Sequence, residues 1–282
     1  MKRIALELAG QLSALALIMA TAIAMMVSVA TADPNTTLER IRSSGVLKVP
    51  VMVGEEPGYV KDPQTGNWGG FYWEWAEDIA ALLGVKAEPV ETTWGNLAAD
   101  FQANKVDIAF GLNPNPKRGL VVDYLTVPLF TDAWAIVAQK DFNKTSWKEL
   151  NDPSVRLVVQ KGSTMQVVAD ALTPKAKITI VEERPLGVLE LKANRADAML
   201  LAIFDAVKVQ PEVGGKIILP SPMLRNPAFL AVKREDGNEG FVNWLTNWTN
   251  QQRALGLAQG KLQQHFEKAG IDLKLLPPEF SF

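Results

Sequence analysis

The stretch RLVVQKGSTMQVVADALTPKAKITIVEERPLGVLELKANRADAMLL, residues 156–201, decides the fold. Its β-branched apolar runs alternate with segments whose apolar residues recur at helical spacing. The pattern predicts strands at 156–160, 178–181 and 198–201 and helices at 164–172 and 186–194. Strand–helix–strand order of this kind implies a parallel sheet with right-handed crossovers.

The same order occurs earlier in the chain, as a repeat of topology and not of sequence. There we expect strands at 46–53, 86–91 and 106–110 and helices at 71–83 and 95–104, the first helix ending at Gly84. Further helices are expected at 238–254 and 260–269, with Gly270 as a stop.

Two apolar extended runs, 133–139 and 229–232, bracket the second copy of the pattern. They predict that the chain crosses to a second lobe and returns. We therefore expect lobe 1 to contain 33–135 and 230–282, and lobe 2 to contain 136–229. Open α/β sheets bind ligands at the carboxyl ends of their strands, so a cleft between the lobes is the expected site.

The first 32 residues have the pattern of a secretory signal. Lys2 and Arg3 precede an uncharged apolar run from Leu12 to Ala30, and Ala30-Thr31-Ala32 fits the small-residue cleavage rule. Cleavage after Ala32 would leave 250 of the 282 residues, in the periplasm. The alternative is a retained membrane anchor, because the run approaches the ~20 residues that span a bilayer. No Cys follows the run, which excludes a lipid-anchored form.

The composition excludes several classes of function. The 282 residues are 48% hydrophobic and 21% charged, with 29 Lys+Arg against 31 Asp+Glu, one His and no Cys. Such a chain folds, and its length suggests two domains, although one barrel is possible on length alone. The balanced charge argues against nucleic acid. Without Cys, and with His265 as the one His, we expect no metal, no cofactor and no thiol chemistry.

Short motifs recur along most of the chain in a characteristic order. They are Gly45–Val49, Pro57–Tyr59, Lys61–Gly66, Gly70–Phe71, Ala76–Ala80, Leu83–Lys86, Trp94–Leu97, Lys105–Asp107, Pro116–Arg118, Val122–Tyr124, Lys161–Thr164 and Arg195–Ala198. Together they resemble family 3 of the extracellular solute-binding proteins. The resemblance implies the periplasmic-binding-protein type II fold, with two α/β lobes joined by two hinge strands around a central cleft. It also implies the receptor of an ABC importer for polar amino acids, and the Pro57–Gly66 variant looks most like the acidic and amide branch.

The resemblance assigns Arg118 first. In the family the arginine of the T-P-x-R turn binds the ligand carboxylate, which a planar guanidinium matches with two donors. The alternative is a surface arginine beside Lys117. Asn115 replaces the usual Thr of the turn, and either residue can stabilise it through side-chain-to-backbone bonds. Gly111 and Asn113 occupy neighbouring positions that contact the ligand in the family.

Aromatic residues are expected at the cleft. Trp94 falls where the family often covers the ligand, with a structural core position as the alternative. Tyr59 lies in the loop after the first strand, which we expect to point into the cleft. The run Phe71-Tyr72-Trp73-Glu74-Trp75 replaces the family's usual helix start, and we expect Phe71, Trp73 and Trp75 mainly to pack.

Ser163 and Thr164 follow Gly162 and open a helix, so their hydroxyls and N–H groups predict an anion site there. In the family this loop adds the second lobe's grip on the carboxylate. An ordinary N-cap is the plainer interpretation, and one residue can serve both purposes.

The main departure from the family is Ala202, where an aspartate usually holds the ligand ammonium. Asp205 or Glu56 could replace it, or the ligand could be a carboxylate without an α-amine. An ammonium buried without a partner costs several kcal/mol. The replacement by Glu56 or Asp205 is the interpretation we favour.

These observations predict a monomeric binding protein whose lobes close on a small polar carboxylate ligand, with an amino acid of the acidic or amide type favoured. The closed form then docks on an inner-membrane permease. The alternative is an enzyme like the periplasmic cyclohexadienyl or arogenate dehydratases, which resemble the same family. Its acid would be Glu56, Glu74 or Asp205. A sensor module of a receptor kinase is disfavoured because the sequence gives no segment after Phe282. His265 is expected at the surface and has no assigned role.

Overall fold

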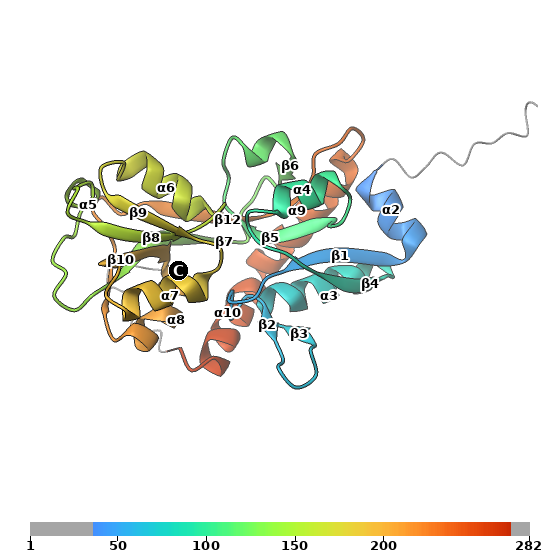
Figure 1. Cartoon of the computed structure of the whole chain (residues 1–282). Coiled ribbons are helices and arrows are strands. Elements are labelled where there is room, and N and C mark those ends of the chain that lie inside the picture. Colours follow the sequence, from blue (N-terminus) through green and yellow to red (C-terminus); the bar gives the residue numbers. More distant parts are fainter. Residues whose placement is uncertain (1–35, 272–282) are drawn as a thin grey trace, which may run out of the picture. The chain divides into compact units, whose positions relative to one another are not determined.

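The computed structural model describes residues 36–271, which belong to one compact unit beginning at Thr36. The predicted signal segment 1–32 lies outside the described residues. In the described chain, helices alternate with strands along the sequence, and the strands pair in both parallel and antiparallel fashion (Figure 1). This confirms the predicted α/β class.

The stretch 156–201 folds as its pattern predicts. Its elements are β8 (Arg156–Gln160), α6 (Thr164–Leu172), β9 (Lys177–Val181), α7 (Arg184–Lys192) and β10 (Ala198–Ala202). Strand β8 pairs in parallel with β9 and with β10, so β8 lies between them. Helix α8 (Ile203–Val213), β11 (Lys216–Ile218) and the short α5 (Trp147–Leu150) complete this part of the chain.

The earlier copy of the pattern has a looser sheet. It contains α2 (Thr37–Ser44), β1 (Val46–Val51), α3 (Phe71–Leu83), β4 (Lys86–Glu91), α4 (Leu97–Gln102) and β5 (Ile108–Leu112), with a small hairpin of β2 (Val60–Lys61) and β3 (Trp68–Gly69). Strands β1 and β4 pair in parallel along six residues. Helix α3 ends at Gly84, which adopts φ 71° as the predicted stop requires.

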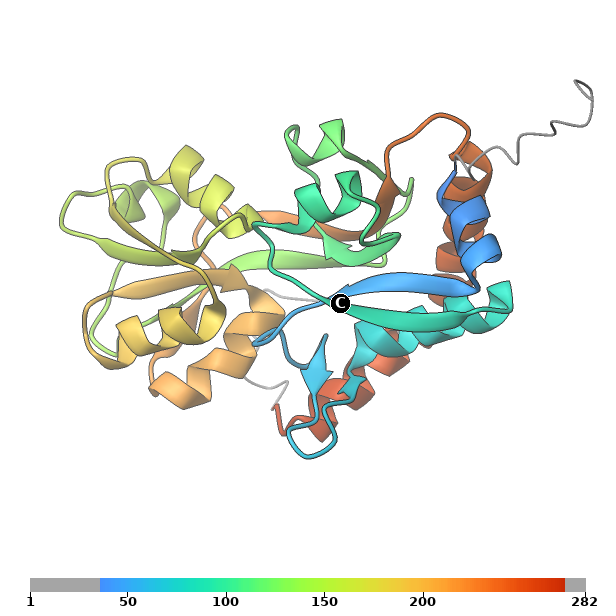
Figure 2. The ribbon, with the colours of Figure 1, turned by 45° about the vertical axis from the view of Figure 1, so that its right-hand side comes forward.

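Two nine-residue strands connect the two copies. Strand β7 (Phe130–Ala138) pairs with β12 (Arg225–Lys233) through Phe130–Ala133 and with β10 through Trp134–Ala138. Beyond its contact with β7, β12 pairs with β5 and with β6 (Val122–Tyr124). Both strands therefore change partners near the predicted lobe boundaries. We propose that the chain is divided into lobe 1 and lobe 2 at these boundaries, as the sequence predicts (Figure 2).

The two copies share a local motif that the sequence comparison missed. Asn104 and Asn194, with φ 55° and 53°, are the non-glycine residues of positive φ in the described chain. Three residues later, Asp107 accepts a hydrogen bond from Lys48 N at 2.8 Å, and Asp197 accepts one from Arg156 N at the same distance. Each aspartate thus ties the start of its β strand to the neighbouring first strand, so the two copies share this four-residue motif in addition to their topology.

The C-terminal helices α9 (Glu239–Ala254) and α10 (Leu257–Lys268) pack on lobe 1. His265 is 7% exposed and lies 2.8 Å from Glu74 Oε1 on α3, which corrects the expected surface position. The reason is helical spacing: Ala258, Leu262, His265 and Phe266 form the buried face of α10.

Candidate functional site

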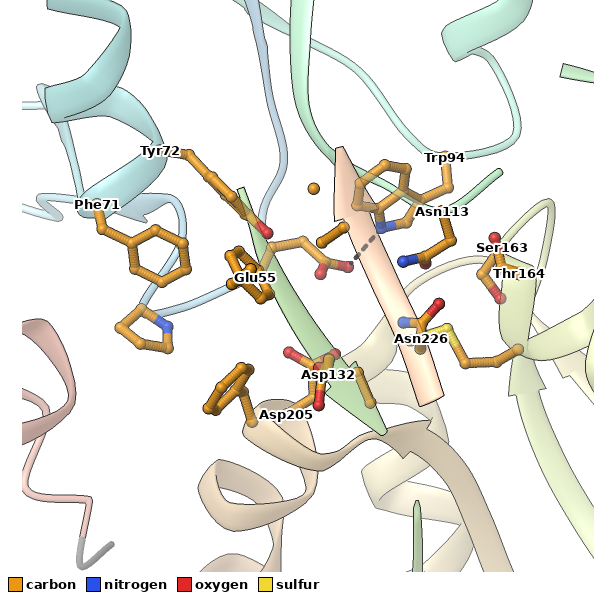
Figure 3. A pocket seen from close by; sticks show the side chains of 18 of the residues that line it. Glu55, Phe71, Tyr72, Trp94, Asn113, Asp132, Ser163, Thr164, Asp205 and Asn226 are labelled. Carbon is orange, nitrogen blue, oxygen red and sulfur yellow. Dashed lines mark hydrogen bonds between the residues drawn. The ribbon is translucent and has the colours of Figure 1, made fainter. Parts of the chain in front are cut away.

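A pocket between the lobes is lined by both of them (Figure 3). Its polar side chains come from the loops after β1 and β4, the turn after β5, the start of α6, strands β7 and β12, and the start of α8. Those that the argument uses are Glu55, Trp94, Asn113, Arg118, Asp132, Ser163, Thr164, Asp205 and Asn226. Most of the predicted site residues therefore meet in one place.

Arg118 is held at the pocket by backbone oxygens and one hydroxyl. Its guanidinium donates to Gly162 O at 2.9 Å, to Thr164 Oγ1 at 3.2 Å and to Asn113 O at 3.4 Å. Asn115 Oδ1 accepts from Arg118 N at 2.8 Å, which confirms that Asn can replace Thr in this turn. No described carboxylate forms an ion pair with Arg118, and burial lowers the pKa of its guanidinium. A half-buried cation without a counter-ion is suited to an anionic ligand group.

The N-terminus of α6 meets Arg118 from lobe 2. Ser163 is the N-cap: its Oγ accepts from Gln166 N and donates to Gln160 O at 2.6 Å. Thr164 is 8% exposed and lines the pocket. A helix N-terminus carries partial positive charge, so it reinforces the attraction of Arg118 for an anion.

Trp94 lies between Arg118 and the acidic part of the pocket. Its ring lies 5.5 Å from the guanidinium carbon of Arg118, and its Nε1 donates to Glu55 Oε1 at 3.0 Å. The dashed line in Figure 3 marks this second contact. Trp94 is half-buried and lines the pocket, the position that the resemblance implied.

A buried ion network joins the two lobes behind the pocket. Arg184, at the start of α7, forms ion pairs with Glu55 and, at 3.1 Å, with Asp205. The side chains of Arg184 and Glu55 are 4% and 7% exposed. Burial raises the pKa of Glu55, to about 7, against the opposing effect of Arg184. Burial likewise raises the pKa of Asp205.

Asp132 is a site residue that the sequence reasoning missed. It lies on β7, is 3% exposed and lines the pocket. Its Oδ1 accepts from Ala133 N at 2.6 Å and from Ile203 N at 3.2 Å. Burial, reinforced by the like charge of Asp205, raises the pKa of Asp132 well above its usual range. An acidic residue directly before the apolar run 133–139 was the signal that could have identified it.

The other side of the pocket is aromatic. Phe71, Tyr72, Phe130, Phe204 and Phe266 line it, and consecutive rings lie within 6.5 Å of one another. Tyr72 reaches the pocket because Gly111 has no side chain. A Cβ at Gly111 would lie 2.2 Å from the Tyr72 hydroxyl, and Gly111 has φ 72°. Trp73 and Trp75 are buried in the core, as expected.

Two predicted site residues do not face the pocket. Tyr59 is 1% exposed in the lobe 1 core, its ring 5.1 Å from that of Tyr72, which occupies the pocket wall instead. Glu56 is half-buried and does not line the pocket. A turn begins at Glu55, whose carbonyl accepts from Gly58 N and Tyr59 N. Successive side chains of a turn point in different directions, and Glu55 takes the inward position expected for Glu56.

Glu74, considered as an acid for the enzyme alternative, also lies away from the pocket. It contacts His265 and, at 3.3 Å, Lys261. Partial burial raises the pKa of Glu74, but these hydrogen bonds outweigh burial and the pKa is lowered. Ala202, by contrast, lines the pocket and precedes the first residue of α8.

The fold and the pocket define a class, the two-lobed α/β receptors that hold a small polar ligand between their sheets. Residues 47–268 match the family described as bacterial extracellular solute-binding proteins, family 3, and the chain belongs to this family.

Three relatives illustrate the range of the family. The chain is 24% identical to a cyclohexadienyl dehydratase of Pseudomonas aeruginosa, over 87% of this chain and 91% of the relative. It is 30% identical to a probable amino-acid ABC transporter-binding protein of Haemophilus influenzae, over 66% of this chain and 74% of the relative. A solved ancestral amino acid-binding protein, described as a precursor of cyclohexadienyl dehydratase, is 29% identical with a TM-score of 0.73, covering 82% of this chain and all of its own.

The fold is therefore that of the type II periplasmic binding proteins, as predicted. Within residues 36–271, no helix combines the length and apolar character that crossing a membrane requires. The same residues contain no group of three or more His, Asp or Glu side chains placed to hold a metal ion.

Proposed function

We propose that this protein is the periplasmic receptor of an ABC importer and captures an amino acid in the pocket between its lobes. The observation that carries the proposal is Arg118. Its guanidinium lies at the junction of the two lobes, without a carboxylate partner among the described residues, beside Thr164 and the N-terminus of α6. A ligand carboxylate supplies the missing anion.

Closure of the lobes follows from the contacts that Arg118 makes. It is a lobe 1 residue, yet it donates to Gly162 O and Thr164 Oγ1 of lobe 2. A carboxylate bound there attracts both lobes, so it shifts the population toward the closed form. The closed monomer then docks on the permease. The named activities of the transporter-binding and amino acid-binding relatives support this proposal.

Substitution of Arg118 tests the proposal. We expect Arg118→Ala to weaken binding of the best amino acid about 100-fold or more, because charge-assisted bidentate contacts to a carboxylate are lost. Thermal-shift and calorimetric titrations with an amino-acid panel measure this. Arg253→Ala, which removes an exposed arginine on α9, is the control and should bind as the wild type does. Equal affinity in both variants would refute the carboxylate site.

The second candidate is a dehydratase of the cyclohexadienyl type. The observation that favours it is Glu55, a pocket carboxyl whose pKa burial raises to about 7, which suits a proton donor near neutral pH. The Pseudomonas aeruginosa relative supports it as well. Turnover of prephenate, followed by ultraviolet absorbance and lost in Glu55→Gln, would favour this function over the receptor. No turnover together with tight amino-acid binding favours the receptor.

A further inference from the structure

Acidic side chains outnumber basic side chains in the pocket. Glu55, Asp132 and Asp205 line it with carboxyl groups, and Arg118 lines it with the one guanidinium among the described lining residues. Arg184 stands behind and pairs with Glu55 and Asp205. Three carboxyl groups therefore face two guanidiniums, so the site carries one excess negative charge when all three are ionised. A ligand of one net positive charge restores the balance.

Asp132 is the carboxylate that has no cation. Arg184 pairs with the other two, and no ion pair of the described residues includes Asp132. Its contacts are backbone N–H groups, and the neighbouring charge is that of Asp205, which has the same sign. The N-terminus of α8 favours the ionised form but supplies only partial charge. A cationic ligand group completes the pairing.

The position of Asp132 explains the alanine at 202. Asp132 Oδ1 accepts from Ile203 N at 3.2 Å, so the carboxylate lies at the backbone beside Ala202. Strand pairing places it there, because Ala202 is opposite Trp134, two residues after Asp132 on β7. A carboxylate carried by β7 thus occupies the space beside the position at which one from β10 was expected.

The two charged ends of the pocket are separated. In Figure 3, Ser163 and Thr164 lie on one side and Asp132 and Asp205 on the other, with Asn113 and Asn226 toward the first side and Glu55 above. Arg118 donates to Thr164 and therefore belongs to the first side. A ligand that spans the pocket can place a carboxylate at Arg118 and positive charge at the acidic side.

We propose that Asp132, together with Glu55 and Asp205, forms a cation subsite, and that the ligand is an amino acid with a second positive charge on its side chain. This proposal rests on the proposed receptor function. The ligand carboxylate pairs with Arg118, and its two cationic groups offset the excess carboxylates. An acidic side chain would add a further carboxylate to the excess, and a ligand with an amide side chain would leave one pocket carboxylate unpaired. Burial of all three carboxyl groups, which raises the pKa of each, is consistent with a site completed by a cation.

Ligands that differ by one charged group test the subsite on the wild-type protein. L-lysine carries both amines, L-norleucine lacks the side-chain amine and 6-aminohexanoate lacks the α-amine. In calorimetric titrations we expect lysine to bind at least about tenfold more tightly than either analogue, and L-glutamate and L-glutamine to bind more weakly than lysine. Equal binding of lysine and norleucine, or tight binding of glutamate or glutamine in preference to lysine, overturns the cation subsite and leaves amino-acid capture standing. Binding of no amino acid refutes the receptor function itself.

A matched pair of variants assigns the effect to Asp132. Asp132→Asn keeps an oxygen for Ile203 N and removes the charge, so lysine should lose about tenfold or more in affinity while norleucine loses less. Asp141→Asn makes the same change at an exposed residue and should leave both affinities unchanged. Equal losses for lysine and norleucine in Asp132→Asn would mean that the residue only shapes the pocket, which contradicts the proposal. Should Asp132→Asn fail to fold, the titrations of the wild type still decide.

Discussion

Arg184, behind the pocket, should contribute strongly to stability through its buried ion pairs. It is 4% exposed and pairs with Glu55 and Asp205, so Arg184→Met would leave two carboxyl groups buried without a cation. Breaking a buried ion pair from one side costs about 3–5 kcal/mol of unfolding free energy. Urea denaturation near pH 7 measures this loss. The loss should shrink near pH 5, because protonation removes the unpaired charges.

Arg195→Met is the control for Arg184. Arg195 pairs with Glu190 in the same lobe, but its side chain is 60% exposed, so water screens the pair and the loss should be small. Similar losses in the two variants would contradict the assignment of the Glu55–Arg184–Asp205 network as a buried, mutually compensating group.

The stability of the free protein and its affinity for a cationic ligand should depend on pH with opposite signs. Folding raises the pKa of Glu55 and Asp132, so the folded protein holds protons that the unfolded chain has lost. Their contribution to stability is present at low pH and is lost as pH rises through about 7, the pKa of Glu55. A cationic ligand favours the ionised carboxylates, so its affinity should rise over the same interval.

Proton release measures this linkage. Lysine titrated in two buffers of different ionisation enthalpy, near pH 7, should show protons leaving the protein on binding. The Asp132→Asn variant should release fewer protons than the wild type when lysine binds. Proton uptake, or affinity that falls as pH rises from about 5.5 to about 8, would contradict the role given to the carboxyl groups.

The sequence identified the site residues that belong to contiguous motifs. Arg118, Asn115, Ser163 and Thr164 lie on turns whose conformation the neighbouring residues determine. Asp132 and Glu55 were missed because their roles depend on contacts across the fold. Asp132 acquires its position from the pairing of β7 with β10, and Glu55 from Arg184, 129 residues away in the sequence. Local patterns contain neither contact.

At the scale of elements, the lobes approach each other closely at Gly95 and Gly162. A Cβ on Gly162 would lie 2.5 Å from Gly95 Cα, and Gly162 has φ 68°. Gly162→Ala should therefore keep the lobes apart at the loop that receives Arg118. We expect ligand affinity to fall on the order of tenfold, and we expect the variant to lack the compaction that closure should produce in small-angle scattering when ligand binds.

Gly256→Ala is the control that separates the effect of the Gly95–Gly162 contact from the effect of backbone strain. Gly256 has the same φ of 68° at the start of α10, and no atom lies within 4 Å of its Cβ position. Both substitutions should cost about 1–2 kcal/mol of stability, because alanine is strained in the left-handed region. Only Gly162→Ala should weaken binding. Equal affinities would show that the Gly95–Gly162 approach does not limit closure.

Periodicity predicted most elements and missed one that supports the site. The helices expected at 71–83 and 164–172 have those bounds in the structure. Helix α8, whose N-terminus receives Asp132, was not predicted. Its β-branched residues continue the apolar run of β10, and Pro211 lies inside it, so local propensity argued against a helix.

For the whole molecule, the sequence predicted two strands that cross between the lobes. In the structure these strands connect the two halves and also carry pocket residues. Strands β7 and β12 pair with each other and then with different partners on either side. Strand β7 also carries Asp132 into the pocket, and β12 carries Asn226. The strands that join the lobes therefore contribute side chains to the proposed ligand site, so the proposed closure and recognition would involve the same elements.

A crystal structure of the protein grown with saturating L-lysine is the most direct test. It should show lysine between the lobes, with its carboxylate within hydrogen-bond distance of the Arg118 guanidinium and of Thr164. One of its ammonium groups should contact Asp132. Lysine bound with its carboxylate away from Arg118, or a pocket that remains without lysine at saturation, would contradict the account.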